Sequence, residues 1–359
     1  MKFKKILLIN IFGIGDVLFT TPFITQLKSA FPDLFIGYLA NRRTAPVLKN
    51  HPKIDRVYIY ERDEFDRLWR TSKLAFMRRG REFLKDIRSE GFDTAVDFSL
   101  NSGINFLIAG AGIPRRLGYN FKNRSPWLTL KFPLAGYEEQ HVVVYYNDLL
   151  RQMGIEPRPT PTEIPVTAAE EAWAEQWLLK AKIPEGRTVF GVVPGGGASW
   201  GKDAAKKRWA PENYAKLADK LVEMFDSTII LVGDEGEADL CAKVASLMTR
   251  PAINACGQTT IGQFAALARR LTVMIVNDGG PLHMAVAAGA RTVSLFGPVD
   301  ERVYGPYAPG VSRQHAVAAL DLSCRPCYRR FRMSDCAHGS CLKNLTVEEV
   351  LKKVESLGL

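Results

Sequence analysis

The first residue of this sequence that could act as a catalytic base is Asp16. It closes the run Gly13-Ile14-Gly15-Asp16, which follows an apolar stretch typical of a buried strand and precedes a stretch typical of a helix. Glycines let the backbone approach a ligand closely, and a helix N-terminus favours anions. A dinucleotide-binding fingerprint would need a further glycine at position 18, where the chain has Leu18. Asp16 is therefore interpreted either as a helix N-cap or as a general base directed into a cleft.

A second candidate site is the glycine run at positions 195–197, which directly follows a predicted strand at residues 188–193. Three consecutive glycines cost backbone entropy, so we expect their conformational freedom to be used, for example to cradle a phosphate. The run is not a P-loop, because no Gly-Lys-Ser or Gly-Lys-Thr follows at the required spacing. Downstream, the Lys-Lys-Arg run at 206–208 is either a solvated charge run or the source of cations for the same ligand site, since a helix is expected to begin at Pro211.

The third motif is Asn277-Asp278-Gly279-Gly280-Pro281-Leu282-His283, at the end of a predicted strand over residues 273–277. Pro281 fits the first position of a helix, so the amide groups of a helix start should face this strand end. His283 could be structural, but its place behind a glycine turn favours ligand binding. Glu235 follows another predicted strand, and it is either part of a charged loop or a carboxylate that accepts ribose hydroxyls.

These motifs need elements that bring strand ends together, and the hydrophobic pattern predicts such elements. In both halves of the chain, short apolar runs alternate with helical patterns, which indicates right-handed βαβ units on parallel sheets. Four prolines within residues 157–165 predict a linker. We therefore expect an α/β chain with two doubly wound domains, residues 1–160 and 161–345, and a final helix at 346–359. Ligands bind outside the carboxyl ends of the strands in such domains.

The composition fits two domains and locates an excess of positive charge. The chain has 359 residues, 47% of them hydrophobic, and no apolar run approaches the ~20 residues of a membrane-spanning helix. Residues 1–160 carry 25 Lys and Arg against 16 Asp and Glu, whereas residues 161–359 carry 23 against 22. A basic half beside a nearly neutral half predicts one domain that faces an anionic partner. Nucleic acid is disfavoured as that partner, because no nucleic-acid-binding motif occurs.

Taken together, the motifs resemble glycosyltransferase family 9, the heptosyltransferase family of lipopolysaccharide core assembly. The resemblance covers nearly the whole chain. It rests on three sets of residues: Gly15-Asp16 with Thr21-Pro22; Pro194-Gly195 followed by Lys207-Arg208-Trp209; and the run at 277–283 followed by Leu295-Phe296-Gly297-Pro298. It implies the GT-B fold, in which two Rossmann-like domains face each other across a cleft and the final helix packs back on the N-terminal domain.

The resemblance also implies an inverting transfer of heptose from ADP-heptose to a lipopolysaccharide core acceptor. Asp16 matches the general base that deprotonates the acceptor hydroxyl. The residues expected to bind the donor are Gly195, Gly196, Ser199, Lys207, Glu235, Asp278, Gly279, Gly280 and His283. The residues expected to contact the acceptor are Gly15, Thr20, Arg115 and Arg116. The long stretch at 198–206 departs from the family pattern, so Ser199 is only a candidate for its hydroxyl-bearing phosphate contact.

Other functions with the same architecture stay open. The donor could be a different nucleotide sugar, or the acceptor a protein of the autotransporter type. A nucleotide-sugar epimerase would need further acid and base residues near the sugar, and a binding module would need no base at all. No Asp-x-Asp metal motif is evident, so we expect catalysis to require no metal cofactor.

Four cysteines form a separate cluster with the spacing C-x2-C-x8-C-x4-C. The residues are Cys324, Cys327, Cys336 and Cys341. This spacing indicates a tetrahedral thiolate site with a structural role, and zinc is the default metal. Iron is an alternative, because some relatives that glycosylate autotransporters look to carry an iron-holding cysteine finger. The other interpretations are four reduced thiols in a loop, or disulfides formed on oxidation.

The basic residues of the first half are concentrated in residues 42–88, which hold 14 Lys and Arg and 7 Asp and Glu among interleaved apolar residues. This segment is either a core-packed helix with a solvated face or a surface for anionic lipid or a phosphorylated acceptor. The family's acceptor is an anionic lipid-linked saccharide. The N-terminal apolar run is interrupted by Asn10 and lacks a cleavage site, so we expect a cytoplasmic protein, peripheral at the inner face of the cytoplasmic membrane.

Overall fold

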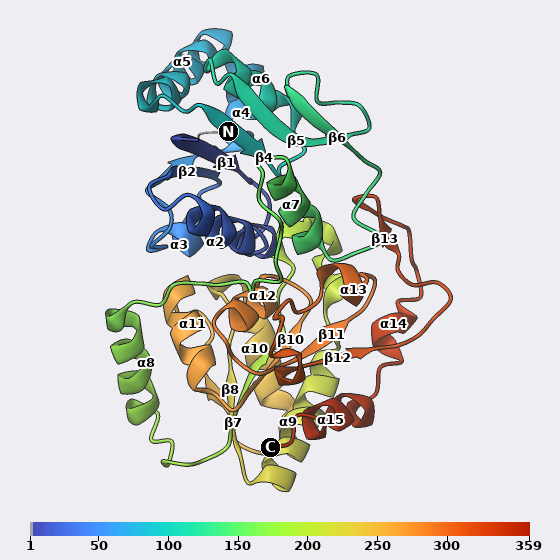
Figure 1. The fold of residues 1–359 in the computed structure, drawn as a ribbon. Helices are drawn as coiled ribbons and strands as arrows, with labels where there is room; N and C mark the ends of the chain where they lie inside the picture. Colours follow the sequence, from blue (N-terminus) through green and yellow to red (C-terminus); the bar gives the residue numbers. More distant parts are fainter. Residues whose placement is uncertain (1–2) are drawn as a thin grey trace. The chain divides into compact units, whose positions relative to one another are not determined.

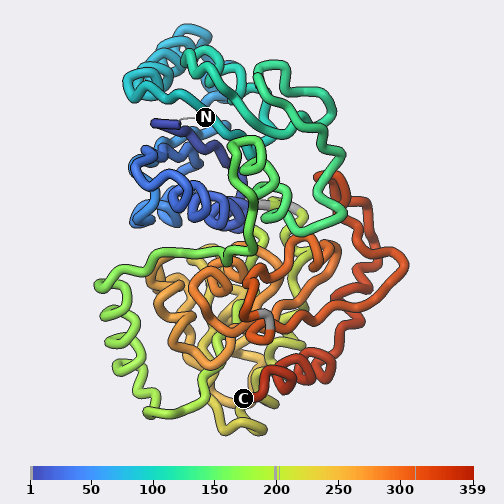
Figure 2. The backbone as a smooth tube through the Cα atoms, viewed as in Figure 1, coloured from blue at the N-terminus to red at the C-terminus, as the bar shows by residue number. Residues whose placement is uncertain are grey.

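The computed structural model describes residues 3–359, except for the side chains of Ala198, Ser199, Lys202 and Ser312. The chain divides into two compact units (Figures 1 and 2). The first unit comprises Met1–Tyr137 and Val142–Thr160, and the second comprises Glu138–His141 and Pro161–Leu359. The main division therefore falls inside the proline-rich segment, and four residues of the first half of the chain pack with the second unit.

The first unit is a parallel six-stranded sheet with the strand order β3-β2-β1-β4-β5-β6. Its strands are β1 (Lys5–Ile9), β2 (Phe35–Ala40), β3 (Arg56–Ile59), β4 (Thr94–Asp97), β5 (Arg115–Phe121) and β6 (Leu130–Leu134). Its helices are α1 (Ile14–Leu18), α2 (Thr21–Ala30), α3 (Ala45–Leu48), α4 (Arg62–Thr71), α5 (Lys73–Glu90), α6 (Ser102–Gly110) and α7 (Val142–Arg151). Ile6, Leu7, Leu8 and Ile9 of β1 are fully buried, as expected for a central parallel strand covered on both faces.

The second unit repeats this architecture with the strand order β12-β11-β10-β7-β8-β9. Its strands are β7 (Val189–Val193), β8 (Thr228–Leu231), β9 (Ile253–Asn254), β10 (Val273–Asn277), β11 (Thr292–Phe296) and β12 (His315–Ala319). Its helices include α8 (Ala168–Lys180), α9 (Pro211–Phe225), α10 (Ala238–Leu247), α11 (Ile261–Arg270), α12 (Gly280–Ala287), α13 (Glu301–Tyr304), α14 (Ser340–Lys343) and α15 (Val347–Glu355). Short 3-10 helices η1 (Ala198–Lys207), η2 (Glu235–Glu237) and η3 (Ser312–Gln314) and a two-stranded ribbon of β13 (Tyr328–Arg329) and β14 (Arg332–Met333) complete it.

Both sheets reverse their winding direction at one point, and that point fixes where ligands can bind. In the first unit it lies between β1 and β4, and in the second between β7 and β10. Open α/β sheets bind ligands outside the carboxyl ends of the strands at this position. The fold class predicted from the sequence, an α/β chain with two doubly wound units, is confirmed.

One expectation about the fold is wrong. The apolar face of the final helix, α15, is covered by the second unit, to which the helix belongs. It contacts α9, β11 and β12 of the second unit, and Val347, Val350 and Val354 are buried in that unit's core. The amphipathic pattern predicts such a helix with Thr346 as N-cap, and Thr346 Oγ1 does accept a bond from Glu349 N.

Within residues 3–359, no helix is both long enough and apolar enough to cross a membrane.

Candidate active site

Asp16 lies in the third position of α1, just beyond the carboxyl end of β1. Its Oδ2 accepts a hydrogen bond of 3.0 Å from Gly13 N, so the carboxylate stabilises the start of its own helix. The buried Asn10 holds the same turn, because its Nδ2 donates to Asp16 O and its Oδ1 accepts from Phe12 N. Asp16 is half-buried. The N-cap position belongs to Gly13, so Asp16 is not the N-cap, and the position of its side chain at the strand end suits a base that acts on a ligand at this edge.

Thr20 supports this turn from inside. It is fully buried, and its hydroxyl donates to Val17 O at 2.6 Å and contacts the Tyr38 hydroxyl at 2.9 Å. A side chain with no accessible surface cannot touch an acceptor. The expectation that Thr20 contacts the acceptor is therefore replaced by a supporting role beneath Asp16, while Gly15 remains in the first turn of α1 beside it.

A second carboxylate, Asp97, ends β4 and was missed by sequence reasoning. Asp97 lies opposite Ile9 in the sheet register, so it stands at the same reversal point as Asp16. It is 1% exposed, and burial raises its pKa, although hydrogen bonds from Ser99 and Asn105 oppose that effect. Ser99 N donates at 2.8 Å and Asn105 Nδ2 at 2.8 Å. Asp97 therefore builds the loop after β4, and its only sequence signal was its place at a strand end.

Arg115 and Arg116 lie near the amino ends of the strands, whereas the expected acceptor site lies at the carboxyl ends, beside Asp16. Arg115 pairs with Thr94 at the amino end of β4, whereas Asp97, level with the end of β1, pairs with Gly118. Three residues of strand separate the two levels by roughly 10 Å. The side chains are also engaged elsewhere: Arg116 Nε donates to Trp127 O at 2.6 Å, and Arg115 lies 3.7 Å from Asp93. The structure does not bring them to the edge that carries Asp16.

In the second unit, Asn277 joins the two central strand ends. Its Nδ2 donates to Pro194 O and to Gly195 O, both at 2.9 Å, and its Oδ1 accepts from Trp209 N at 3.2 Å. Asn277 is 2% exposed, so these bonds are made inside the unit. The glycine loop after β7, the end of β10 and the chain entering α9 are therefore held together by one amide side chain.

The carboxylate that organises the glycine loop is Glu237, which sequence reasoning also missed. Its Oε1 accepts from Gly196 N, and its Oε2 accepts from Asp234 N at 3.2 Å. A Cβ on Gly195 would lie 2.2 Å from the Glu237 carboxyl, so a larger residue there would displace this carboxylate. The expected donor ligand Glu235 begins the same 3-10 turn, η2, but is exposed. Its role remains an expectation.

Lys207 and Asp278 form a buried ion pair at this strand edge. Lys207 Nζ lies 2.5 Å from Asp278 Oδ2, and each side chain is 5% exposed. The Lys207 ammonium also lies 4.2 Å from the centre of the Trp200 ring. Lys207 ends η1, the long stretch after the glycine loop, and the side chain of Ser199 in that stretch lies outside the described residues. The arrangement sets a cation beside the glycine amides and the N-terminus of α12, which is suited to a phosphate group.

His283 lies in the first turn of α12, behind the N-cap Gly279. It is 6% exposed, and its pKa is lowered to about 3 by burial, with the charges of His141 and Lys207 acting in the same direction. His141 belongs to the segment that packs with this unit, where its Nε2 lies 3.1 Å from Gly305 O and its ring packs on Tyr307. The structure thus brings together Gly195, Gly196, Lys207, Asp278, Gly279, Gly280 and His283, and adds His141.

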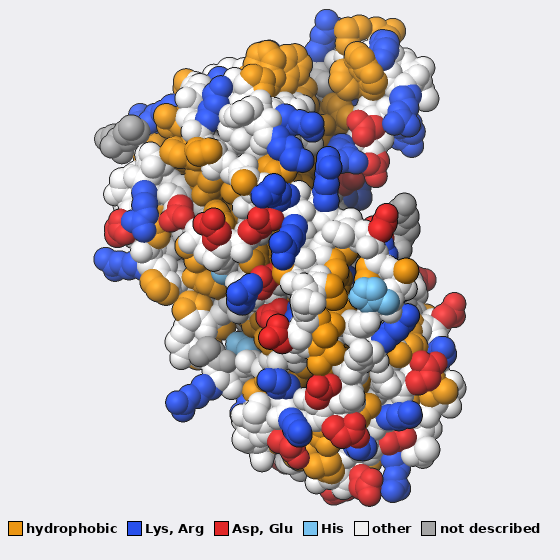
Figure 3. Space-filling view, turned by 90° about the vertical axis from the view of Figure 1, so that its right-hand side faces the viewer, with side chains coloured by type: hydrophobic (Ala, Val, Ile, Leu, Met, Phe, Trp, Pro, Cys, Tyr) orange, Lys and Arg blue, Asp and Glu red, His pale blue; other side chains and the backbone are white. Residues whose placement is uncertain are grey.

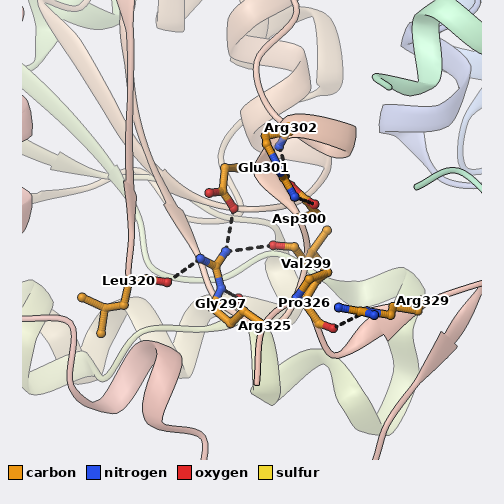
Figure 4. A network of polar contacts seen from close by, with 9 residues as sticks. All are labelled: Gly297, Val299, Asp300, Glu301, Arg302, Leu320, Arg325, Pro326 and Arg329. Carbon is orange, nitrogen blue, oxygen red and sulfur yellow. Dashed lines mark hydrogen bonds and ion pairs between the residues drawn. The ribbon is translucent and has the colours of Figure 1, made fainter. Parts of the chain in front are cut away.

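Arg325 anchors the loop that follows β11. Its buried guanidinium donates to three main-chain carbonyls and to Glu301 (Figure 4). The carbonyl acceptors are Gly297 O and Leu320 O, each at 2.6 Å, and Val299 O at 3.1 Å; Glu301 Oε2 lies at 2.7 Å. The Gly297-Pro298 turn is therefore fixed by a residue of the cysteine segment.

The four cysteines of that segment lie near one another without forming a ligand set. Burial raises the pKa of the Cys327 thiol, and the other three cysteines raise it further through their charges. Cys327 Sγ donates to Cys324 O at 3.2 Å, and Gly339 N donates to Cys336 Sγ at 3.4 Å. Among the side chains that the structure describes, no group of three or more His, Cys, Asp or Glu is placed to hold a metal ion. The metal site stays a prediction.

Comparisons with known proteins show the family of the chain. The model of glycosyltransferase family 9 (heptosyltransferase) matches residues 80–338. Lipooligosaccharide heptosyltransferase 2 of Campylobacter jejuni is 29% identical over 178 residues, which are 49% of this chain and 52% of that protein. The matched region therefore spans about half the length of that curated relative.

Solved structures share the fold over nearly the full chain. The family 9 glycosyltransferase from Veillonella parvula superposes with a TM-score of 0.80 at 21% identity, covering 99% of this chain and 98% of the other. The Escherichia coli ADP-heptose lipopolysaccharide heptosyltransferase II gives 0.76 at 19% identity, covering 98% of each. Because the family model spans most of the chain, from α5 through the cysteine segment, the chain belongs to glycosyltransferase family 9, the heptosyltransferases.

Proposed function

We propose that this protein is an inverting glycosyltransferase that transfers heptose from ADP-heptose to a lipopolysaccharide core acceptor. The observation that supports the proposal is the cluster at the reversal point of the second sheet, where Lys207 pairs with Asp278 just before the N-terminus of α12. The E. coli relative named for ADP-heptose supports the choice of donor.

The leaving group explains why this site needs a cation. Departure of the nucleoside diphosphate places negative charge on a phosphate oxygen, and a buried cation with aligned amides stabilises that charge. Lys207 is balanced by Asp278 before donor binds, so the unit avoids an isolated buried charge. A bound diphosphate would share the same ammonium. No metal is needed in this scheme.

Asp16 is the proposed general base. One carboxylate oxygen is held by Gly13 N, which fixes the orientation of the group at the end of β1. A base in this role removes the proton from the acceptor hydroxyl as it attacks the anomeric carbon, on the face opposite the leaving diphosphate. Inversion of configuration follows from that single displacement.

The proposed acceptor is an anionic lipid-linked saccharide, and the proposed location is peripheral, at the inner face of the cytoplasmic membrane. The charge distribution supports both, since the excess of Lys and Arg lies in residues 1–160. A cationic unit attracts a phosphorylated acceptor as well as an anionic leaflet.

The test is Asp16→Asn, which keeps the shape of the side chain and removes the basic oxygen. We expect transfer from ADP-heptose to isolated lipopolysaccharide core to fall by about 10²–10⁴-fold, the usual contribution of a general base. ADP binding, measured by calorimetry, should stay unchanged because Lys207 lies in the other unit. Asp33→Asn, an exposed carboxylate of the same unit, is the matched control.

Transfer by the Asp16→Asn variant at near wild-type rate would refute the base assignment. Thermal stabilisation of the protein by UDP-sugars, with none by ADP-heptose, would refute the donor and favour an epimerase or another transferase.

A further inference from the structure

The turn between α4 and α5 projects apolar and cationic side chains together. We name residues 67–81 the α4–α5 elbow. Ser72 ends α4 and begins α5, and its hydroxyl accepts a bond from Ala75 N at 3.2 Å, so the bend has a defined geometry. Both helices belong to the first unit, and α5 is labelled at one end of that unit in Figure 1.

Three large apolar side chains of the elbow are exposed. Leu74 is 73% exposed, Trp69 54% and Met77 48%. In the part of the chain that the structure describes, no other large hydrophobic side chain is as exposed as Leu74. Trp69 is nevertheless held in place, because its ring packs on Phe76 at 5.1 Å between centroids and Phe76 packs on the buried Phe65. The apolar tip is thus supported by the core.

The charge of the elbow has one sign. Residues 67–81 contain six Lys and Arg and no Asp or Glu. Arg70 and Lys73 flank the apolar tip and are exposed, and the Lys73 ammonium lies 3.1 Å from the centre of the Trp69 ring. Figure 3 shows hydrophobic side chains and Lys or Arg side chains intermixed on one face of the molecule.

An open, cationic surface hollow lies along α5. It has a volume of about 350 Å³ and is lined by Arg81, Leu84, Lys85, Arg88 and Ser89. Three cations in one hollow, next to the elbow, are suited to the phosphate of a lipid headgroup.

We infer that the α4–α5 elbow inserts Trp69, Leu74 and Met77 into the interface of an anionic lipid bilayer. Exposed apolar side chains gain free energy on leaving water, Trp favours the headgroup level, and Lys and Arg are attracted to anionic lipid. Charge complementarity favours an anionic bilayer as the partner. The Lys and Arg side chains around the tip match the lipid phosphates, and the apolar tip matches the acyl chains beneath them. The inference rests on the proposed membrane location and names the element that produces it.

The test compares two triple variants in sedimentation with vesicles of phosphatidylcholine, with and without phosphatidylglycerol. The elbow variant carries Trp69→Ser, Leu74→Ser and Met77→Ser. The matched control carries Leu179→Ser, Met224→Ser and Leu247→Ser, three large apolar residues of the second unit that are also exposed. None of the six is buried, so both variants should fold, which circular dichroism and stabilisation by ADP will check.

We expect wild type and control to sediment with anionic vesicles at low salt, and the elbow variant to bind at least about 10-fold more weakly. Replacing Arg70 and Lys73 by Gln should weaken binding about fivefold for each cation, on anionic vesicles alone. Trp69 fluorescence should shift to the blue with these vesicles, and Trp69→Phe should remove that shift.

Equal sedimentation of the elbow variant and wild type, or an equal loss in the control, would overturn the inference. So would a wild-type dimer that the elbow variant converts to a monomer, because a second copy would then cover the elbow. Absence of wild-type binding to anionic vesicles would overturn it too, while ADP stabilisation and the Asp16→Asn result would still judge the transferase proposal separately.

Discussion

Removal of the Arg325 guanidinium should destabilise the second unit by about 3–5 kcal/mol. The side chain is 8% exposed and makes four hydrogen bonds, three of them to carbonyls of segments that flank β11 and β12 (Figure 4). Each bond contributes about 1 kcal/mol net, and each acceptor left unpaired adds a desolvation cost. Glu301 is 31% exposed and regains water, which keeps the total near that range.

The assay is urea unfolding of Arg325→Met, followed by tryptophan fluorescence in a background that carries Trp69→Phe and Trp127→Phe, so that the remaining tryptophans, Trp209 among them, all lie in the second unit. Trp209 is 1% exposed in the core of the second unit and donates to Leu345 O, so its emission reports that unit rather than the other. A two-unit chain need not unfold in one step, which is why a local probe is needed. The free energy of unfolding of Arg325→Lys should lie between those of the wild type and Arg325→Met. An ammonium keeps the charge but lacks the planar guanidinium that reaches all four acceptors.

The matched control lies four residues away. Arg329 is an exposed arginine of the same segment with one bond, from its Nε to Pro326 O at 3.1 Å. Arg329→Met should change the free energy of unfolding by no more than about 0.5 kcal/mol. If the two Met variants shift the urea midpoint equally, the bonds of Arg325 do not hold the Gly297 turn and the reasoning fails.

Three further changes test other parts of the site. Burial and neighbouring charges lower the pKa of His283 to about 3, against about 6.5 in an unfolded chain, so unfolding takes up a proton as pH falls through this window. Stability should fall there by about 1.4 kcal/mol per pH unit for this group, a slope that His283→Asn should remove in urea titrations at several pH values. Lys207→Met should cost about 3–5 kcal/mol by leaving Asp278 buried and unpaired, and adding Asp278→Asn should restore stability in urea but not ADP affinity in calorimetry; a double variant as unstable as the single would contradict this. Elemental analysis of protein purified without chelator should find zinc or iron, reduced by Cys327→Ser and retained in Cys256→Ser, and a folded, metal-free wild type would eliminate the four-cysteine site.

The sequence pattern predicts the strands that are buried on both faces better than those at the edges of the two six-stranded sheets. Of the edge strands it predicts β3, as Arg56–Tyr60, and misses β6, β9 and β12; it also misses the inner strand β5. β1, β7, β10 and β11 are short apolar runs, and every residue of the last three is buried, so pattern and burial coincide. β6 contains Pro133 and is mostly accessible, and β9 has only two residues. A proline is tolerated on an edge strand because the edge needs fewer ladder bonds, so no apolar run marks it.

The sequence predicts the location of a site residue correctly where its position in the chain is enough to determine that location. Asp16 and Asp278 follow central strands, and the carboxyl ends of parallel strands share an edge of the sheet, so their placement needs no knowledge of packing. Arg115 fails because its strand was not predicted, and with it the edge to which the residue belongs. The packing of α15 was predicted wrongly for a related reason. An amphipathic pattern shows that a helix has an apolar face, but it does not show which core that face covers.

Glu235 and Glu237 show most clearly what local pattern leaves undetermined. They lie two residues apart in one 3-10 turn, where neighbouring side chains point in different directions. Only the approach of the glycine loop decides between them, because the Glu237 carboxyl occupies the space that a Cβ on Gly195 would need. The glycine loop and the buried Glu237 therefore form one structural unit, although about forty residues of chain lie between them. The glycines at 195–197 indicate that some group must come close to the loop, but not which group. That group is a carboxylate of the protein, which lies against Gly195 and accepts a hydrogen bond from Gly196 N.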